Sequence, residues 1–435
     1  MDGNMITIRV PSLDNVEVDK SVISLIDTPY FQRLRKIKQL SLTHLVYPGA
    51  NHTRFEHSLG VFLLASKYKN HLSENELFQS IVKPEHLRAL PYAALLHDIG
   101  HYPFGHILEN WVSDLPEHEK RSEEIVTNLD LSAILHSCDV DPVVVGQLIT
   151  GDFIGSSDYQ SLRLVRDLLD SPVDADKMDY LERDSLHCGV PYGRSYDKER
   201  LMGSLIVSPE GRLALSAKGK SSAEYVIFSR YIMLTEVYWH HTVRSAAIML
   251  IRAMQEATKF DGWDAYRSKL VENFGDEDAL AGLGELVKDD PDVYELVRGL
   301  GNRHLYKRIR TYSPMDPDSI EVFDALSGLE GSSDALRLSS DLTNMLGLSR
   351  MKLLVDILPS KPMTQDISVF YSKRGRYRLL SEVSPIASSL TDTWKSLTGV
   401  VRIYCHPSVA ADAQKRGEEI DEAVIDAAKK IKSNK

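Results

Sequence analysis

Residues 95–110 read LLHDIGHYPFGHILEN and set an adjacent His97–Asp98 pair, followed by His101 and His106, directly behind an apolar run. An ionised carboxylate in apolar surroundings is costly unless a cation or hydrogen bonds neutralise it. Divalent metal ions take neutral imidazoles and ionised carboxylates as ligands. The stretch therefore indicates a metal centre at a helix end. In the simpler interpretation, Asp98 caps the next turn and His97 is a hydrogen-bonded core residue.

Two further ligands are expected from distant parts of the chain, in NHTRFEHSLG (residues 51–60) and PVDADKMDY (residues 172–180). Each stretch also holds a basic residue, Arg54 or Lys177, that could hold a phosphate. The expected metal ligands are His57, His97, Asp98 and Asp176. Two imidazoles and two carboxylates suit one Fe, Mn, Zn or Mg ion, and they leave a position for water or a phosphate oxygen.

Composition limits the classes of function. The chain has 435 residues, 43% of them hydrophobic and 26% charged, which is typical of a folded globular protein. The formal net charge of −11 argues against nucleic acid and anionic membranes as partners. Three scattered cysteines, no signal-peptide pattern and no long apolar run lead us to expect a cytoplasmic protein.

Periodicity predicts a mainly α fold: a helical core with short β-hairpins and a small C-terminal α+β lobe. The expected helices are 21–42 with a break at Thr28–Pro29, 54–72, 84–100, 119–135, 174–189, 221–254 and 408–432, and residues 259–350 are expected to form acidic helices with turns. The expected strands lie within 5–18, in a hairpin at 205–216, and in 352–358, 366–371, 376–381 and 399–407. The expected domains are 1–200, 201–350 and 351–435.

Four strings in order carry a family resemblance: IDTPYFQRLRKIKQLSLTHLVYPGANHTRFEHSLGV, LLHDIGHYPFGH, EHE at 117–119, and DADKMDYLERDS. Together they resemble the HD-domain superfamily of metal-dependent phosphohydrolases, and within it the deoxynucleoside triphosphate (dNTP) triphosphohydrolases. The resemblance implies one divalent metal ion per subunit and hydrolysis of a dNTP to deoxynucleoside and triphosphate. Two alternatives stay open: another nucleotide phosphohydrolase, such as a nucleotidase or phosphodiesterase, and a non-catalytic nucleotide-binding protein.

The resemblance also implies roles for individual residues, beginning with the same four metal ligands. The implied phosphate contacts are Arg54, Lys177 and His101, the proton-transfer residues are His106, Glu109 and His118, and the sugar contacts are Gln39, Leu40, Tyr180 and Asp184. Glu109 departs from the family pattern, since close relatives carry Asp there, but a Glu three residues after His106 can still orient the imidazole. Simpler interpretations place His118 in solvent, His101 in a turn and Tyr180 in the core.

Regulation and assembly follow the family less closely. An allosteric nucleotide site in the vertebrate relative is matched here by Asp27, Gln32 and Arg35. Its adjoining turn reads RVPSLDN (residues 9–15) here, without the family's His-Gly, and Ile6 stands where a lysine is expected. An activator site of that form is therefore not expected. The family assembles as dimers, tetramers or hexamers, and the apolar helix at 221–254 fits such an interface, so we expect a homo-oligomer.

Overall fold

The structure is a computed structural model that describes residues 5–11, 15–109, 115–329, 331–358, 366–390 and 399–433. By their contacts the residues form two compact units, the first Met1–Leu234 with Thr364–Leu390 and the second Thr235–Met363 with Thr391–Lys435. The division at residues 200 and 350 stays a prediction. Part of the turn at 9–15 lies outside the described residues.

Helices dominate the first unit, which holds every site residue expected from the sequence. Its α-helices are α1 (Lys20–Ile26), α2 (Pro29–Gln32), α3 (Arg54–Leu72), α4 (Glu76–Ile81), α5 (Pro84–Leu96), α6 (His106–Glu109), α7 (His118–Val126), α8 (Leu129–Ser137), α9 (Pro142–Thr150), α10 (Tyr159–Arg166), α11 (Ala175–Cys188), α12 (Lys198–Met202), α13 (Lys220–Met233) and α20 (Leu380–Val383). Its 3-10 turns are η1 (Arg33–Lys36), η2 (Ser41–Leu45), η3 (Tyr192–Arg194), η4 (Ala217–Gly219) and η7 (Ser372–Arg374).

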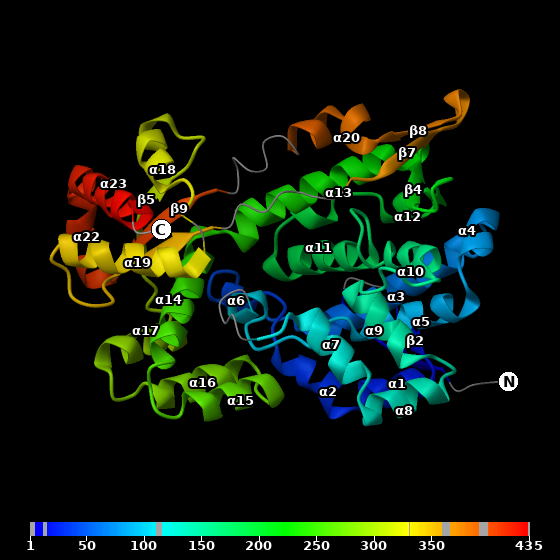
Figure 1. Cartoon of the computed structure of the whole chain (residues 1–435), viewed down its shortest axis with the longest axis horizontal. Helices are drawn as coiled ribbons and strands as arrows, with labels where there is room; N and C mark the ends of the chain where they lie inside the picture. The colour runs from blue at the N-terminus through cyan, green and yellow to red at the C-terminus, as the bar shows by residue number, and fades with distance from the viewer. Residues whose placement is uncertain are drawn as a thin grey trace. The chain divides into compact units, whose positions relative to one another are not determined.

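Helix α3 lies at the centre of this unit and packs against α5 and α11 (Figure 1). It is buried along most of its length, which its many small and apolar residues permit. Helix α11 begins at Asp174, whose carboxylate accepts a hydrogen bond from the Lys177 backbone N–H (2.6 Å), and it ends at Gly189 in the left-handed conformation. The start of α3, the end of α5 and the start of α11 carry the expected metal ligands.

Two small sheets complete the first unit. Strands β1 (Ile6–Ile8) and β2 (Val16–Val18) pair antiparallel, and so do β3 (Leu205–Val207) and β4 (Leu213–Ser216), which confirms the hairpin predicted at 205–216. Strand β4 also pairs in parallel with β7 (Ser368–Tyr371), whose other neighbour is β8 (Arg376–Leu379). The strands expected at 366–371 and 376–381 therefore join the hairpin rather than the strands of the second unit.

The second unit combines a three-stranded antiparallel sheet with helices. The sheet has the order β5 (Lys307–Tyr312), β9 (Val401–Cys405), β6 (Leu353–Ile357). The helices are α14 (His241–Ala257), α15 (Trp263–Glu272), α16 (Asp276–Leu286), α17 (Pro291–Gly301), α18 (Ile320–Leu326), α19 (Gly331–Met345), α22 (Pro407–Lys415) and α23 (Gly417–Ser433), with the 3-10 turn η6 (Pro317–Ser319). Leu338, Leu342, Val355, Ile403 and Val424 are among the residues of its core, which joins the sheet to helices α18, α19, α22 and α23.

The mainly α fold class is confirmed, but several predicted helices are interrupted. The helix expected at 119–135 is broken because the Asn128 side chain caps a new helix, accepting from the Leu131 N–H (3.0 Å). The helix expected at 221–254 contains a π turn at Leu234–Tyr238, after which α14 starts afresh. Strand β5 corrects the prediction of helices with turns over 259–350; it was missed because its sequence KRIRTY lacks a clear alternation of apolar and polar residues. Among the described residues no helix is both long and apolar enough to span a membrane.

Candidate active site

The four expected metal ligands come together at the ends of α3, α5 and α11. The His57 Nε2 atom lies 2.9 Å from Asp176 Oδ1 and 3.9 Å from Asp98 Oδ2. The His97 Nε2 atom lies 3.3 Å from Asp98 Oδ1 and 3.7 Å from Asp176 Oδ1. Burial disfavours a charged imidazole, yet the hydrogen bonds to Asp176 and Asp179 outweigh it and raise the pKa of His57 to about 10. The space between these carboxylates therefore favours positive charge, as a metal centre requires.

His97 provides a test of whether a metal ion fits. Its Nδ1 lies 2.8 Å from the Ala94 carbonyl, which can only accept, so Nδ1 carries the proton and Nε2 carries the lone pair. That Nε2 is buried and has no hydrogen-bond partner among the described residues. A buried, unsatisfied acceptor is unfavourable in a folded protein unless a ligand satisfies it. The four residues thus fit one divalent ion, and Fe, Mn, Zn and Mg remain the candidates.

A carboxylate and a guanidinium that the sequence analysis missed hold His57 in place. The His57 Nδ1 atom lies 2.8 Å from Asp179 Oδ2, and Arg183 donates to both oxygens of Asp179 (2.9 and 2.8 Å). Such an outer carboxylate fixes the tautomer of a metal-binding histidine and directs its other nitrogen to the ion. The spacing of Asp179 three residues after Asp176, and of Arg183 four residues later, is the signal that could have revealed them.

Gly60 of α3 has no side chain, and this leaves space for the Asp179–Arg183 pair. A Cβ atom at Gly60 would lie 1.9 Å from Asp179 Oδ1 and 2.6 Å from Arg183 Nη2. We expect Gly60→Ala to lower the free energy of unfolding by about 1–3 kcal/mol, as overpacking does, and to weaken metal binding at His57. Denaturant unfolding and metal titration measure the two effects. The control Gly301→Ala, with nothing within 4 Å of the added Cβ, should change neither; equal losses in both variants would contradict the prediction.

Asp98 connects the metal-type cluster, which consists of His57, His97, Asp98 and Asp176, to Arg54 and His101. Its Oδ2 accepts from Arg54 Nη1 (2.6 Å), and its Oδ1 lies 3.2 Å from His101 Nε2. Burial works against the ionised carboxyl, but Arg54, His97 and His101 hold the pKa of Asp98 well below its usual range. Burial, Arg54 and His118 lower the pKa of His101, so that ring is neutral near pH 7. The simpler interpretation, in which His101 only forms part of a turn, does not account for its buried contact with Asp98.

A second cation lies at the start of α11. The Lys177 ammonium donates to the buried Asp174 carboxylate (2.6 Å), and although burial lowers the pKa of Lys177, Asp174 raises it further, so the group stays charged. Arg230 of α13, which the sequence analysis did not single out, is close enough to influence the pKa of both Lys177 and Tyr180. Lys177 and Arg230 thus place positive charge beside Tyr180, near the start of α11.

The three expected proton-transfer residues also lie together. Glu109 accepts from the His118 backbone N–H (2.7 Å), and its two oxygens lie 2.9 Å from His118 Nδ1 and 3.0 Å from His106 Nδ1. Burial disfavours the ionised carboxyl, but the bonds from His106 and His118 hold the pKa of Glu109 far below its usual range. Burial also disfavours a charged His118, yet Glu109 raises its pKa. His118 is buried rather than solvated, while His106 is exposed.

The expected sugar contacts are connected through His52, a residue that the sequence analysis missed. Its buried ring bonds to Asp184 (Nε2 to Oδ1, 2.8 Å) and stacks on His187, and its backbone carbonyl accepts from the Gln39 N–H (3.0 Å). Leu40 follows at the start of η2, and Tyr180 lies one turn before Asp184 on α11. The Gln39 Oε1 atom is buried without a hydrogen-bond partner among the described residues. One buried histidine thus holds two of the four residues.

The three residues that match the vertebrate allosteric site are also neighbours. Gln32 donates to the Ile26 carbonyl (2.9 Å) and accepts from Arg35 Nε (2.8 Å), and the Arg35 guanidinium lies 3.6 Å from the centre of the Phe55 ring. Asp27 is exposed at the end of α1. These contacts suffice to explain the conformations of Gln32 and Arg35 without a bound nucleotide.

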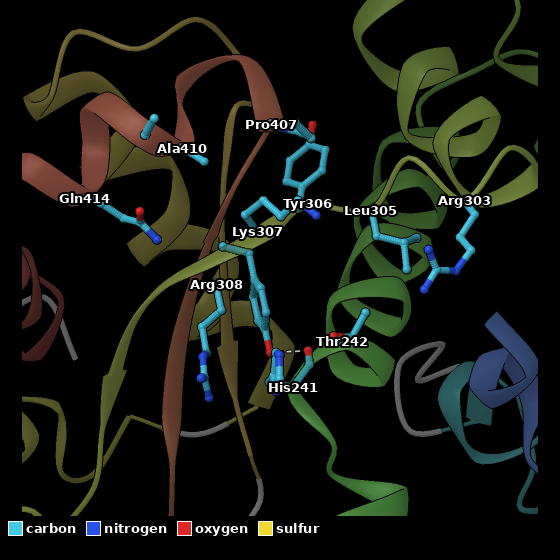
Figure 2. A pocket seen from close by; sticks show the side chains of 12 residues that line it. His241, Thr242, Arg303, Leu305, Tyr306, Lys307, Arg308, Pro407, Ala410 and Gln414 are labelled. Carbon is cyan, nitrogen blue, oxygen red and sulfur yellow. Dashed lines mark hydrogen bonds between the residues drawn. The ribbon is translucent and has the colours of Figure 1, made fainter. Parts of the chain in front are cut away.

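A separate cavity of about 600 Å³ lies within the second unit (Figure 2). Residues from the start of α14, the segment leading into β5, and α22 line it. Arg303, Lys307 and Arg308 give it basic character, and Tyr306 contributes an aromatic ring. No site residue expected from the sequence lines this cavity.

Two imidazoles and two carboxylates beside buried cations are the groups that a metal-dependent phosphohydrolase requires. Comparison with known proteins agrees: the HD domain family matches residues 54–184, and the HD associated region matches residues 196–426. The chain is 32% identical over 381 residues to an uncharacterized protein of Methanocaldococcus jannaschii, covering 86% of this chain and 74% of that one. The chain therefore belongs to the HD-domain phosphohydrolase family.

The match to another relative includes a smaller share of that relative's length. The chain is 32% identical over 302 residues to the deoxynucleoside triphosphate triphosphohydrolase SAMHD1 homolog of Dictyostelium discoideum, and the match covers 67% of this chain but 58% of that one. The crystal structure of a phosphohydrolase from Bacteroides thetaiotaomicron has a TM-score of 0.69 at 24% identity and covers 93% of this chain. A hypothetical protein from Aquifex aeolicus gives a TM-score of 0.70 at 24% identity. At 24% identity, these two structures support the fold but not a particular activity.

Proposed function

We propose that this protein hydrolyses deoxynucleoside triphosphates to deoxynucleoside and inorganic triphosphate. The observation that carries the proposal is the continuous contact between two clusters. Asp98 of the metal-type cluster contacts His101 (3.2 Å), and the His101 ring stacks on His118 of the proton-transfer cluster (3.8 Å between centroids). A phosphate ester bound between them would meet both an electrophilic centre and an acid–base pair. The Dictyostelium relative, named as an enzyme of this activity, supports the choice of substrate.

The proposed roles follow from chemistry. A divalent ion held by His57, His97, Asp98 and Asp176 would supply Lewis acidity toward a phosphate oxygen. Arg54 and Lys177, each anchored by a carboxylate, would stabilise charge that develops on the phosphates. His106 or His118, oriented by Glu109, would donate a proton to the departing 5′-oxygen, which is otherwise a poor leaving group.

Specificity for deoxyribose is assigned to the residues grouped around His52. Gln39 and Asp184, held by His52, would accept or donate hydrogen bonds to the sugar hydroxyl. Leu40 and Tyr180 packed under C2′ would leave a 2′-hydroxyl without room or partner, and an unsatisfied buried hydroxyl is strongly disfavoured. We also propose that the protein acts in the cytoplasm and forms a homo-oligomer. Analytical ultracentrifugation can measure the oligomeric state.

Product analysis tests the proposal directly. The purified full chain, stripped of metal and resupplied with Mn, Mg, Fe or Zn, is given each of the four dNTPs and GTP. We expect release of deoxynucleoside and intact triphosphate, with little turnover of GTP. Release of orthophosphate or pyrophosphate would instead indicate another nucleotide phosphohydrolase, and no turnover with any metal, even with nucleotide mixtures as potential activators, would indicate a binding protein.

A further inference from the structure

A second group of metal-ligand side chains lies outside the four residues assigned to the first ion. His106 and Glu109 of α6 and His118 of α7, with His101 beside them, each offer a ligand atom within 4.8 Å of the others. Three imidazoles and a carboxylate in so small a volume are more donors than a proton relay requires. The chemistry of the group is that of a transition-metal site.

Three of the four side chains meet at the Glu109 carboxylate. The Nδ1 atoms of His106 and His118 lie 3.0 and 2.9 Å from the two oxygens of the same carboxylate, that of Glu109. The rings of His106 and His118 are inclined by 74°, with centroids 5.3 Å apart. In a tetrahedral zinc site with bonds of about 2.0–2.1 Å, ligand atoms lie roughly 3.4 Å apart. Both Nδ1–oxygen distances are therefore within about 0.5 Å of the spacing that a zinc site requires.

His101 is excluded as a ligand by its orientation. Its ring lies parallel to that of His118, at 11° and 3.8 Å between centroids, so the in-plane lone pairs of the two rings cannot meet at one ion. Its Nε2 also faces Asp98 (3.2 Å). His101 therefore supports the His118 ring and separates the second group from the first metal-type cluster. Two imidazoles and one carboxylate remain, a ligand set that zinc accepts with an open fourth position.

We propose that His106, Glu109 and His118 bind a Zn²⁺ ion distinct from the one held by the His57 cluster. His106, whose side chain is 63% exposed, gives the ion access from solvent. Since zinc would compete with protons for both Nδ1 atoms, the second ion prevents formation of the imidazolium that serves as general acid. This inference rests on the proposed function. It makes excess zinc an inhibitor of hydrolysis, even where zinc at the first site permits activity.

Metal stoichiometry tests the second site without reference to catalysis. The metal-stripped full chain is dialysed against Zn²⁺ and analysed by mass spectrometry of bound metal. We expect two ions per wild-type chain and one in each of His106→Ala and Glu109→Gln, with the first site retained. His97→Ala should lose the first ion and keep the second, so the double variant His97→Ala/Glu109→Gln should hold neither. The control His136→Ala, at an exposed position of α8, should keep two.

Cobalt provides a spectroscopic control on ligand identity. In the His97→Ala background, Co²⁺ at the second site should show the visible absorption of a four-coordinate ion, and Glu109→Gln should abolish it. One zinc ion per wild-type chain, or a second ion that survives both His106→Ala and Glu109→Gln, would overturn the inference. Hydrolysis is measured separately, with Mn²⁺ as the only added metal. Two zinc ions per chain but no dNTP hydrolysis with Mn²⁺ would leave the second site standing and refute the proposed function, whereas one zinc ion per chain with dNTP hydrolysis would do the reverse.

Discussion

His97→Ala should abolish both divalent-metal binding at the His57 cluster and phosphate-ester hydrolysis, while the protein remains folded. The Nε2 atom of His97 has no hydrogen-bond partner among the described residues, and its Nδ1 bonds only to a backbone carbonyl. Removing this ring therefore strips a ligand without leaving a charge unpaired, because Asp98 keeps its bond to Arg54 (2.6 Å). A metal ion contributes several kcal/mol to transition-state stabilisation, so kcat/KM should fall at least about 10³-fold.

His97 is a better choice for this experiment than the other ligands. Asp98→Ala would leave the buried Arg54 guanidinium without its carboxylate, and an unpaired buried charge costs about 3–5 kcal/mol. His57→Ala would remove one of the two buried partners of Asp179, which would keep only its bonds to Arg183. Metal content, thermal unfolding and hydrolysis are measured on His97→Ala beside the control His136→Ala. A variant that retains metal and activity would show that the first site lies elsewhere, and an unfolded variant would show that the His97 ring is needed for the fold.

The sequence was sufficient to predict which four side chains gather at these helix ends, because they carry strong local signals. His97 and Asp98 follow a buried helix, and His57 and Asp176 lie near the beginnings of two others, so burial and helix ends together indicated where charge must be neutralised. Their convergence depends on how α3, α5 and α11 pack, which periodicity does not specify.

The residues that were missed act through tertiary contacts alone. His52 lies outside every predicted helix, and only the fold brings it within 2.8 Å of Asp184, which is 132 positions away in sequence. Asp179 was within a predicted helix but resembled an ordinary acidic residue until α3 was placed against it. The break at Leu234–Tyr238 was missed for another reason: the π turn has i→i+5 hydrogen bonds and changes the helical period, but no glycine or proline between Met233 and Thr242 marks the place, so the apolar pattern of 221–254 was taken as one helix.

Glu109→Gln should lower kcat by about 10²- to 10⁴-fold, the range attributed to a positioned acid–base group, with metal at the His57 cluster retained. The carboxylate bonds to the Nδ1 atoms of both His106 and His118. Burial lowers the pKa of His118 and Glu109 raises it, so replacing the charge with a neutral amide should let that pKa fall. A general acid works only while protonated, and activity is lost as pH rises through its pKa.

The basic limb of the kcat–pH profile should therefore move to lower pH in Glu109→Gln, a shift that damage to packing alone would not produce. The measurement uses Mn²⁺ as the only added metal, so that zinc does not occupy the second group. Glu109→Asp is the matched control: it keeps the negative charge with one methylene fewer, and it should retain more activity and a basic limb closer to that of the wild type. If kcat falls equally in both variants and neither limb moves, Glu109 fixes the start of α7 through the bond from the His118 backbone N–H and does not tune the proton donor.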